Sequence, residues 1–475
     1  MELHVSLVGR KNLSGEIYRQ LRSAILGERL RPGDALPPSR ELAKRLGVSR
    51  TTVTVAYDRL AGEGFVVSRV GAGTFVRERV RRPVRLPKRD APAGVLQPRA
   101  VWDSVVVSRA FVREAQFDLR TGLPDPWLFP HDAWRRLIAR ELRSKSPAGG
   151  VYGHPAGHLG LREAIARHIA ISRGVETTAD DVTITSGAQQ AIDLIARVLI
   201  SPGDRVAVED PGYPPPRYLF ASHGARLTGV PVDAEGIAVD ALPRRARLVY
   251  VTPSHQYPLG MPMSLARRAE LLAWAERTNA AIIEDDYDSE FRFHGRPIEP
   301  LQTLDTSGRV IYVGSFSKSL LPTLRLGFVV APPSLRDAMH RAKYVMDWHA
   351  PLVVQAALAR FIDAGDFARH LRKVGGIYRA RHELVTSALA RDFAEQLDVV
   401  PSAAGLHVTA LARTASVRAV QEIVRRASAA GVELQALSGF AVEASSQRAG
   451  LVVGYGAIPT MRIEEAFRRL RSCWE

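Results

Sequence analysis

The sequence VGSFSKSLLPTLRLGF, residues 313–328, places a single lysine, Lys318, inside a largely apolar run. Ser315 lies three residues before Lys318, Ser317 directly precedes it, and Arg325 follows seven residues later. Burial takes hydration away from an ammonium group and lowers its pKa. An unprotonated amine flanked by hydroxyl groups can condense with an aldehyde. This stretch therefore predicts a reactive lysine in a buried site.

The surrounding sequence alternates short β-branched runs with helical patterns. The runs include DVTITSG (181–187), RVAVEDPG (205–212), AAIIEDDY (280–287) and RVIYVGSFS (309–317). Such alternation is typical of an α/β domain with a mostly parallel, buried sheet. Ligands bind these sheets at the carboxyl ends of the strands, and that is where the polar pieces SGAQQ, EDPGYP and EDDYDSE fall in this chain. We therefore expect the reactive lysine to lie in a ligand site at this edge.

Pyridoxal 5'-phosphate (PLP) is a cofactor whose aldehyde needs such a lysine, together with a carboxylate for its ring nitrogen and a cradle for its phosphate. Asp285 or Asp286, at the end of a buried strand, can reach the ring nitrogen, while Tyr287 can reach the ring hydroxyl. The SGAQQ segment opens a helix whose first amides suit a phosphate, and the serines and the arginine of 315–325 would complete the cradle. The sequence therefore predicts a PLP site, with no metal.

Residues 13–76 contain three short helical patterns and then two strand-like runs. Ser14 and Ser39 are the expected N-caps of the first two helices, and Gly47 is the expected stop of the second. The expected buried positions of the first and third helices are Ile17, Leu21, Ala24, Ile25, Val53, Ala56, Tyr57 and Leu60. A tight turn between the last two helices and a Gly-Ala-Gly turn between the strands are typical of a winged helix-turn-helix.

Positive charge is concentrated at the amino-terminal end. The chain has a formal net charge of +16, and residues 1–112 hold 21 Lys and Arg residues against 10 Asp and Glu residues. Charge alone fits a solubilising tail as well as a nucleic-acid partner, but the helix-turn-helix pattern favours DNA. Residues 77–100 carry eight Lys and Arg residues and four prolines without an amphipathic period. This predicts an extended linker, which contacts DNA or is simply solvated.

Length and composition point to an ordinary soluble protein. The 475 residues suggest two or three domains, with 46% hydrophobic and 24% charged residues. No apolar stretch approaches the roughly 18 residues that span a bilayer, and the first residues lack a signal-peptide pattern. Cys473 is the only cysteine, so no intrachain disulfide can form. We expect a cytoplasmic protein.

The stretch GERLRPGDALPPSRELAKRLGVSRTTVTVAYDRLAGEGFVVSRVGAGTFV (27–76) resembles the DNA-binding domain of GntR-type bacterial regulators over nearly its whole length. The resemblance implies two groups of DNA contacts. The helices would contact operator bases or phosphates through Arg40, Ser49, Arg50, Thr51 and Thr52. The wing would touch the minor groove or the backbone through Arg69, Gly71 and Gly73.

The larger part of the chain, roughly residues 116–475, resembles the fold-type I aminotransferase family. The motifs that carry the resemblance are VYGHPAGHLGLREAI (151–165), TSGAQQAIDL (185–194), EDPGYPP (209–215), IIEDDYDSEF (282–291) and SFSKSLLPTLRLG (315–327). The resemblance implies that Lys318 forms the Schiff base with PLP, and that Asp285 pairs with the pyridinium nitrogen. Tyr287 would then donate to the ring oxygen.

The same resemblance implies the rest of the cofactor site. It assigns the phosphate to Ala188, Gln189, Ser315, Ser317 and Arg325. Tyr213 would stack on the cofactor ring. Tyr152 would reach the phosphate of the neighbouring subunit, which implies a dimer with shared sites.

Two departures from the aminotransferase pattern affect the expected function. Aminotransferases usually carry an Asn-Pro-Thr-Gly segment whose asparagine bonds the cofactor's ring oxygen. Here the stretch is PSHQYPLG, with Tyr257 at that position, and His255 and Gln256 are the candidates to replace it. A late-strand arginine that clamps the substrate carboxylate is also missing from AGLVVGYG (449–456), and Arg448 precedes this stretch. Losing that clamp costs substrate positioning and puts complete transamination in doubt.

The combination of a winged helix, a basic linker and an aminotransferase-like domain resembles the MocR subfamily of GntR-type regulators. It implies a DNA-binding domain at 1–77, a basic Pro-rich linker at 78–115 and a PLP-binding effector domain at 116–475 with a small C-terminal α+β subdomain. The expected protein is a head-to-tail homodimer that binds operator DNA and senses PLP or an amine. The alternatives are a working aminotransferase with a DNA-binding module and, more weakly, a scaffold without cofactor.

Overall fold

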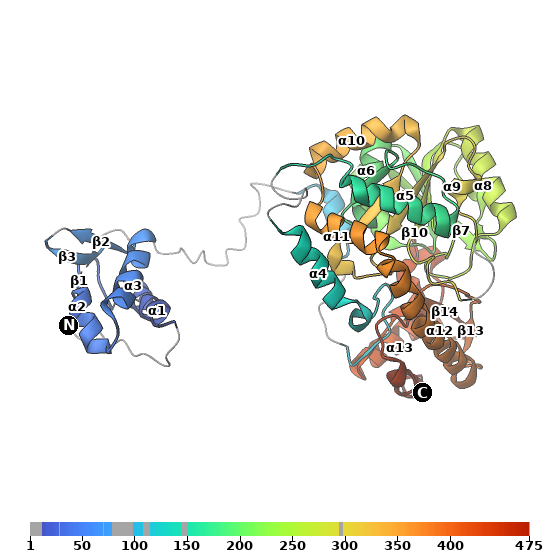
Figure 1. The fold of residues 1–475 in the computed structure, drawn as a ribbon. Helices are drawn as coiled ribbons and strands as arrows, with labels where there is room; N and C mark the ends of the chain where they lie inside the picture. Colours follow the sequence, from blue (N-terminus) through green and yellow to red (C-terminus); the bar gives the residue numbers. More distant parts are fainter. Residues whose placement is uncertain are drawn as a thin grey trace. The chain divides into compact units, whose positions relative to one another are not determined.

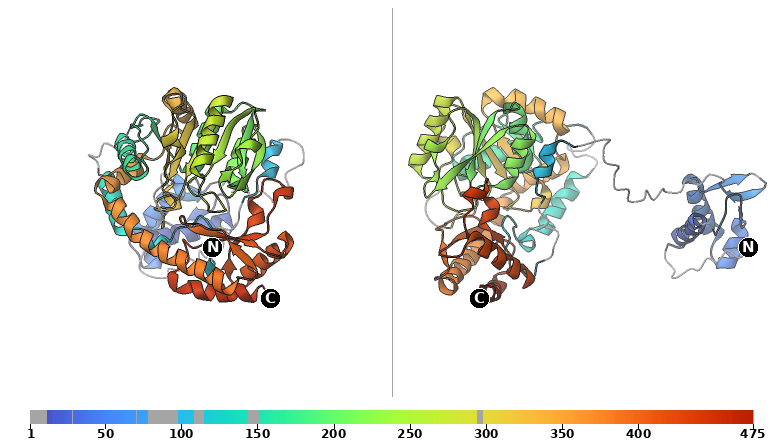
Figure 2. Two further views of the ribbon diagram at one scale, coloured as in Figure 1. Left: turned by 90° about the vertical axis from the view of Figure 1, so that its right-hand side faces the viewer. Right: turned by 180° about the vertical axis from the view of Figure 1, so that it is seen from behind.

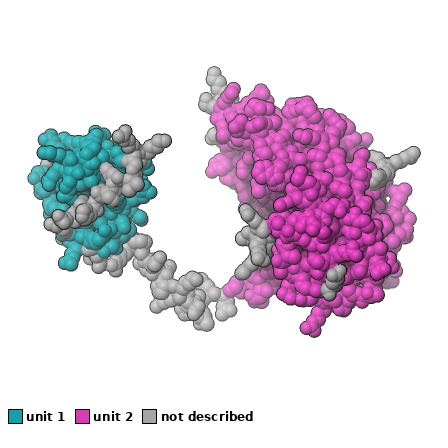
Figure 3. Space-filling view, turned by 90° about the horizontal axis from the view of Figure 1, so that it is seen from below, with its two compact units in different colours: residues 1–97 teal, residues 98–475 magenta. Residues whose placement is uncertain are grey.

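The structure, a computed structural model, describes residues 12–27, 29–69, 71–77, 98–107, 115–143, 151–293 and 298–474. The chain forms two compact units, Met1–Gln97 and Pro98–Glu475 (Figure 3), and each has its own hydrophobic core. Most of the predicted linker, 78–97 and 108–114, lies outside the described residues. The domain boundaries that the sequence suggests therefore stay predictions.

The first unit packs helices against a small antiparallel sheet (Figure 1). Its described elements are α1 (Leu13–Leu26), β1 (Ala35–Leu36), α2 (Ser39–Leu46), α3 (Arg50–Gly62), β2 (Val66–Arg69) and β3 (Gly73–Val76), with strand order β1-β3-β2. All eight apolar positions predicted for the first and third helices are buried. The predicted winged helix-turn-helix is confirmed.

The two N-cap predictions are wrong by one or two residues. Helix α1 follows Asn12, so Ser14 already lies inside the first turn. Helix α2 follows Pro38, whose φ of −52° and ψ of 139° end the preceding extended segment, and Ser39 is the first helical residue. Gly47 ends α2 with a φ of 65°, a left-handed conformation that glycine adopts without strain, as the sequence predicts.

The second unit is built on a mostly parallel sheet of eight strands. The strand order is β5-β12-β11-β10-β9-β6-β7-β8. The strands are β5 (Val182–Thr185), β6 (Arg205–Asp210), β7 (Arg226–Asp233), β8 (Gly236–Ile237), β9 (Ala246–Val251), β10 (Ala281–Asp286), β11 (Val310–Ser315) and β12 (Gly327–Val330). The central pairs from β7 to β11 are parallel, and β12 pairs antiparallel with β11 and with β5. The predicted α/β class is confirmed.

Helices cover both faces of this sheet (Figure 2) because successive residues of a buried strand point to opposite sides. Val206 and Val208 of β6 pack in one cluster with α6 and α7, while Ala207 between them packs with α8 on the other side. The helices of this part are α4 (His131–Glu141), α5 (Leu159–Arg173), α6 (Ala188–Leu199), α7 (Pro214–Ser222), α8 (Leu265–Thr278), α9 (Leu301–Leu304), α10 (Pro333–Asp347) and α11 (Leu352–Asp363). The strand ends are thereby held rigidly at one edge.

A smaller α+β subdomain follows the 27-residue helix α12 (Asp366–Asp392). Its elements are β13 (Leu397–Val399), β14 (His407–Ala412), α13 (Val417–Ala429), β15 (Val432–Glu433), β16 (Gln435–Ala436), β17 (Gly450–Gly454) and α14 (Ile463–Ser472), and β15 pairs with β4 (Phe117–Asp118). Apolar side chains of α12, α13, α14 and the strands form one core. In the described ranges, no helix combines the length and the apolar character needed to cross a membrane.

Candidate cofactor site and DNA-binding surface

Lys318 lies just beyond strand β11, at the carboxyl edge of the parallel sheet. Its Nζ donates to the main-chain oxygen of Gly122 at 2.8 Å. Burial lowers the pKa of the Lys318 amine; the carboxylates of Asp288 and Asp285 oppose this shift, and the charge of Arg325 adds to it. The amine is thus shifted in the direction that the sequence predicts.

Asp285 is the next-to-last residue of strand β10, and one of its carboxylate oxygens is unsatisfied. Its Oδ2 accepts from the Tyr250 hydroxyl at 2.6 Å, whereas its buried Oδ1 has no hydrogen-bond partner in the part of the chain that the structure describes. Burial raises the pKa of Asp285 to about 6. A buried acceptor without a donor is costly, and a protonated ring nitrogen would supply that donor. The residues present therefore fit the pyridinium end of PLP.

The neighbouring Asp286 also has a buried Oδ1 without a hydrogen-bond partner among the described residues, but three side chains hold its other oxygen. Its Oδ2 accepts from Arg173 Nε at 2.9 Å, from the Tyr312 hydroxyl at 2.5 Å and from Ser289 Oγ at 2.8 Å. Adjacent residues of a strand point to opposite faces of the sheet, so the two aspartates serve different neighbours. Of the two candidates that the sequence left open, this arrangement favours Asp285 for the ring nitrogen.

The predicted phosphate residues are brought together by strand register. Ser315 of β11 pairs with Gly327 of β12, which pairs with Thr185 directly before the α6 turn. Helix α6 begins at Ala188 after Gly187, whose φ is 82° and which leaves the first turn without a side-chain cap. The amides of such an end suit an anion.

Arg325 closes this region from the other side. Its Nη2 donates to the main-chain oxygen of Ser186 at 2.7 Å, and a Cβ at Gly187 would lie only 3.0 Å from the guanidinium. Ser315 Oγ donates to Ser317 Oγ at 3.0 Å. Ser186, Gln189 and Arg325 also line an open cavity of about 600 Å³. The residues predicted for the phosphate thus surround one accessible helix end.

The two predicted aromatic residues of the cofactor site, Tyr213 and Tyr152, lie in different parts of the second unit. Tyr213 precedes α7, is 37% exposed and packs edge-on against Tyr257, with ring centroids 5.3 Å apart. Tyr152 is 75% exposed and stacks on Trp348 of its own chain at 4.4 Å. The structure thus places Tyr213 at the site edge, while Tyr152 lies on an outward surface.

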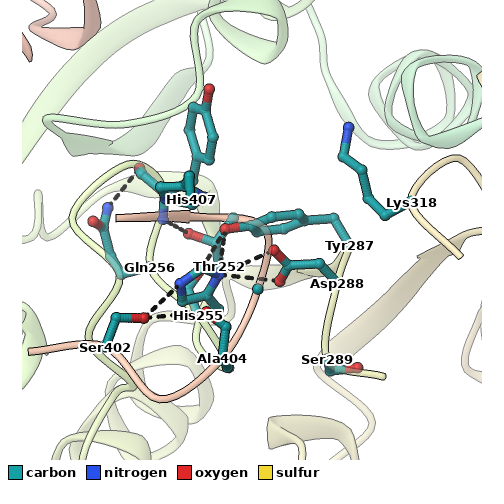
Figure 4. Close-up of polar contacts among 12 residues, drawn as sticks. Thr252, His255, Gln256, Tyr287, Asp288, Ser289, Lys318, Ser402, Ala404 and His407 are labelled. Carbon is teal, nitrogen blue, oxygen red and sulfur yellow. Dashed lines mark hydrogen bonds and ion pairs between the residues drawn. The ribbon is translucent and has the colours of Figure 1, made fainter. Parts of the chain in front are cut away.

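His255 and Asp288 form a buried pair beside Tyr287 (Figure 4). His255 Nδ1 lies 3.1 Å from each Asp288 oxygen, and the Tyr287 hydroxyl donates to the His255 carbonyl at 2.9 Å. Burial and the nearby His255 hold the pKa of His407 well below its ordinary value. Ligand atoms of His255, Asp288 and His407 lie within 4.8 Å of one another. However, both His255 nitrogens and His407 Nε2 already have protein partners.

Sequence reasoning missed Asp288, Tyr250 and Ser402 as members of this region. The tetrad DDYD in IIEDDYDSEF held the only signal for Asp288. Tyr250 and Ser402 reach the site from distant strands or loops and carried no signal.

The two sequence departures are visible as side-chain placements. The Tyr257 hydroxyl lies 2.6 Å from Thr121 Oγ1, so it already has a hydrogen-bond partner within the protein. Strand β17 is buried. Its Val452 packs with Tyr257 and Phe440 in the stretch where aminotransferases usually carry the carboxylate-binding arginine. Arg448 is exposed just before this strand. Within the described residues, β17 itself supplies no cation.

The predicted DNA contacts lie on the exposed side of the first unit. Ser49 caps α3 by accepting from the Thr52 amide at 3.1 Å, and Arg50 Nε lies 3.4 Å from Ser39 Oγ of α2. Arg40 and Thr51 are exposed beside them. These five predicted helix residues therefore share one end of the α2–α3 pair.

The predicted wing residues lie at the tip of the β2–β3 hairpin. Arg69 is exposed and its guanidinium lies over the Phe75 ring at 5.3 Å. Gly71 and Gly73 have φ values of 77° and 114°, which an L side chain adopts only with strain. The tip can thus approach a phosphate backbone closely.

Comparisons with known proteins cover both units. The profile "Bacterial regulatory proteins, gntR family" matches residues 13–76, and "Aminotransferase class I and II" matches residues 123–461. The chain is 38% identical to the "Probable rhizopine catabolism regulatory protein MocR" of Rhizobium meliloti, over 97% of this chain and 93% of that protein. It is 32% identical to the "HTH-type pyridoxine biosynthesis transcriptional regulator PdxR" of Corynebacterium glutamicum, over 93% and 91%.

Solved aminotransferases share the fold of the second unit. Pyrococcus horikoshii kynurenine aminotransferase, solved in complex with PMP, is similar with a TM-score of 0.72 and 26% identity, over 78% of this chain and 95% of that one. The α-aminoadipate aminotransferase LysN of Thermus thermophilus, solved with N-(5'-phosphopyridoxyl)-L-leucine, has a TM-score of 0.71 and 29% identity, over 79% and 96%.

Proposed function

We propose, on the premise that the chain belongs to the MocR subfamily of GntR-type transcriptional regulators, that it binds PLP at Lys318 and that PLP or an amine sets its affinity for operator DNA. The observation that carries the proposal is the unsatisfied Oδ1 of Asp285, the aspartate of the pair that acts electrostatically on Lys318. Asp285 and Lys318 lie close enough for each to shift the pKa of the other. An aldehyde-bearing pyridinium would satisfy both groups at once.

The chain's own residues would hold the cofactor from three sides. Asp285 would accept from the ring nitrogen, and Tyr213 would cover one face of the ring. The phosphate would lie at the start of α6, held by the first amides at Ala188 and Gln189, by the two hydroxyls of Ser315 and Ser317, and by Arg325. When bound, PLP supplies an aldehyde that a primary amine can take over from the lysine.

The DNA-binding unit would read an operator through the start of α3. Arg40, Arg50, Thr51 and Thr52 would reach bases or phosphates in the major groove, with Ser49 fixing the helix start. The wing, with Arg69, Gly71 and Gly73, would follow the backbone or the minor groove. Binding should weaken steeply with salt because the phosphate contacts release counterions. A protein acting on an operator would work in the bacterial cytoplasm.

We further propose a head-to-tail homodimer. The exposed Tyr152, stacked on Trp348, would reach the phosphate site of the partner subunit. Two DNA-binding units per dimer favour repeated or palindromic half-sites. A ligand that binds one conformation of the dimer better would shift the population competent for DNA.

The second candidate is a working aminotransferase that carries a DNA-binding unit. The grouping of Lys318, Asp285 and Arg325 favours it. The apolar packing of Val452 in β17 counts against it, because a clamp for a substrate carboxylate is not supplied there. Sustained turnover of an amino donor with a 2-oxo acid would support this candidate, and no turnover across many pairs would exclude it.

The proposal is tested by the absorption spectrum of the purified full-length protein with PLP, followed by borohydride reduction and peptide mapping. A lysine-linked band that is trapped on Lys318 supports it. The control is Lys318→Ala, which should bind PLP without the trapped adduct. A wild-type protein that shows no such band, or an adduct on another lysine, would rule the proposal out.

A further inference from the structure

Among the residues that the structure describes, the Tyr287 hydroxyl has hydrogen-bond contacts with one residue. It donates to the main-chain oxygen of His255 at 2.9 Å, and its oxygen lies 3.0 Å from His255 Nδ1. A phenol has a single proton to donate, so its direction depends on what its neighbours offer. Both of these neighbours are atoms of His255, as Figure 4 shows. The carbonyl is a backbone atom that any residue at position 255 supplies, so Nδ1 is the atom through which the side chain of His255 acts on this hydroxyl.

The His255 ring is itself fixed from two further directions. Both Asp288 oxygens lie 3.1 Å from Nδ1, and Ser402 Oγ lies 3.1 Å from Nε2. An ionised carboxylate only accepts hydrogen bonds, which places a proton on Nδ1. A Cβ at Gly405 would lie 2.0 Å from His255 Cε1, so the loop that contains Gly405 packs directly onto the ring. The ring cannot turn without breaking these contacts.

The polar groups of the two sequence neighbours of His255 have partners other than the Tyr287 hydroxyl. The Gln256 amide nitrogen donates to Glu209 Oε2 at 3.2 Å, to the Pro211 oxygen at 3.0 Å and to the Tyr257 oxygen at 2.8 Å. The Tyr257 hydroxyl lies against Thr121. The Tyr257 ring packs edge-on against the Tyr287 ring, with centroids 5.8 Å apart. Of the three residues 255–257, however, His255 is the one whose side chain lies within hydrogen-bond distance of the Tyr287 hydroxyl in the described part of the chain.

We propose that His255, held by Asp288 and Ser402, is a positioning residue that aims the Tyr287 hydroxyl at the ring oxygen of the cofactor. The inference rests on the proposed PLP binding and adds the residue that replaces the missing asparagine. Ser402 lies in the loop between β13 and β14, so the contact also joins the cofactor side of the sheet to the C-terminal subdomain.

A correctly aimed donor has a measurable consequence. A hydrogen bond from Tyr287 to the ring oxygen stabilises the deprotonated form of the lysine-linked cofactor more than the protonated form. The reason is that the ring oxygen carries more negative charge once the proton shared with the lysine nitrogen is lost. Loss of the donor should therefore raise the pH at which the absorbance of the lysine-linked cofactor titrates. The charged and titratable groups that face His255 are Asp288, Tyr287 and His407, and the charge of Lys318 acts on His407.

The test compares this midpoint in the PLP-loaded full-length protein for four forms. These are the wild type, His255→Phe, Tyr287→Phe and the double variant. We expect His255→Phe to raise the midpoint by roughly one unit, the scale of one hydrogen bond to a charged oxygen. Tyr287→Phe should raise it at least as much, and His255→Phe should add nothing once the hydroxyl is gone.

Two further variants separate positioning from mere stability. His255→Asn can present an amide nitrogen near the place of Nδ1 and should recover most of the shift. His131→Phe, an exposed histidine at the start of α4, should leave the midpoint unchanged. If His255→Phe does not fold, Ser402→Ala takes its place in both backgrounds, since it releases the ring without emptying the site. If Ser402→Ala raises the midpoint in the wild type but not in Tyr287→Phe, that result supports the inference.

An unchanged midpoint in His255→Phe or Ser402→Ala, or shifts that add fully to that of Tyr287→Phe, would overturn the inference. In that case the wild type still shows the lysine-linked band, and the proposed function stands. A wild type without the band would overturn both.

Discussion

Replacing Asp285 with asparagine should stabilise the cofactor-free protein at neutral pH while weakening PLP binding. Burial raises the pKa of this carboxyl from 3.8 to about 6. A folded-state pKa above the unfolded one means that stability is fully present below pH 3.8 and is lost as pH rises through about 6. At 1.36 kcal/mol per pKa unit, the ionised group costs the cofactor-free fold about 3 kcal/mol at pH 7.

Asparagine removes the charge but brings an amide whose protons lack acceptors, at a cost of about 1–2 kcal/mol. The net expectation is a gain of about 1–2 kcal/mol at pH 7 that shrinks toward pH 5. The matched control is Asp286→Asn at the next position. Asp286 accepts from Arg173, whose side chain is largely buried, so breaking that pair should destabilise the fold by about 3 kcal/mol.

The assay is thermal unfolding of cofactor-free protein between pH 5 and 8, with the wild type and both variants side by side. Glu209, Glu284 and Glu290 also have pKa values raised by burial, to about 7, 7 and 8, so only differences between variants isolate Asp285. With PLP present, Asp285→Asn should weaken binding by at least tenfold because the ring nitrogen loses its acceptor. If Asp285→Asn destabilises the cofactor-free protein as much as Asp286→Asn does, the reasoning about the unsatisfied oxygen is refuted.

Three other substitutions test separate parts of the account. Arg50→Ala should weaken operator binding at least tenfold, the scale of one lost base contact, and leave the cofactor spectrum unchanged; a lost spectrum in this variant would contradict the division into two units. Lys318→Ala should keep the fold, by circular dichroism, and the basal DNA affinity while losing any response to amines, and a variant that cannot fold would argue against this. Gly405→Ala forces a side chain to a φ of 81° and against His255, so it should lower thermal stability by about 2 kcal/mol or more, and an unchanged melting curve would mean that the loop packs differently.

The sequence predicts the parts of this site that lie next to one another along the chain. Lys318 with Ser315 and Ser317, and Asp285 with Tyr287, sit in short motifs at strand ends, where a parallel sheet gathers its polar residues. The buried stripes of α1 and α3 followed from helical spacing alone. Residues this close in the sequence are placed by the geometry of a single helix or strand, so their spacing is enough to predict which of them lie together.

Contacts between distant residues could not be predicted in the same way. Ser402 meets His255 across 147 positions, and Arg173 meets Asp286 across 113. Motif spacing within the aminotransferase resemblance favoured Asp285 over Asp286, but it does not reveal that Arg173 holds Asp286. The N-caps were missed because Asn12 and Pro38 start the helices one or two residues earlier than the serines suggested.

The central claim is that chemistry at Lys318 controls DNA binding, and operator affinity measured by fluorescence anisotropy tests it most directly. The full-length protein is compared without cofactor, with PLP, and with PLP plus candidate amines, beside Lys318→Ala. The account predicts that one of these ligands changes the operator Kd of the wild type severalfold and leaves that of Lys318→Ala unchanged. Equal Kd values for the wild type in every state, or the same response in Lys318→Ala, would contradict it.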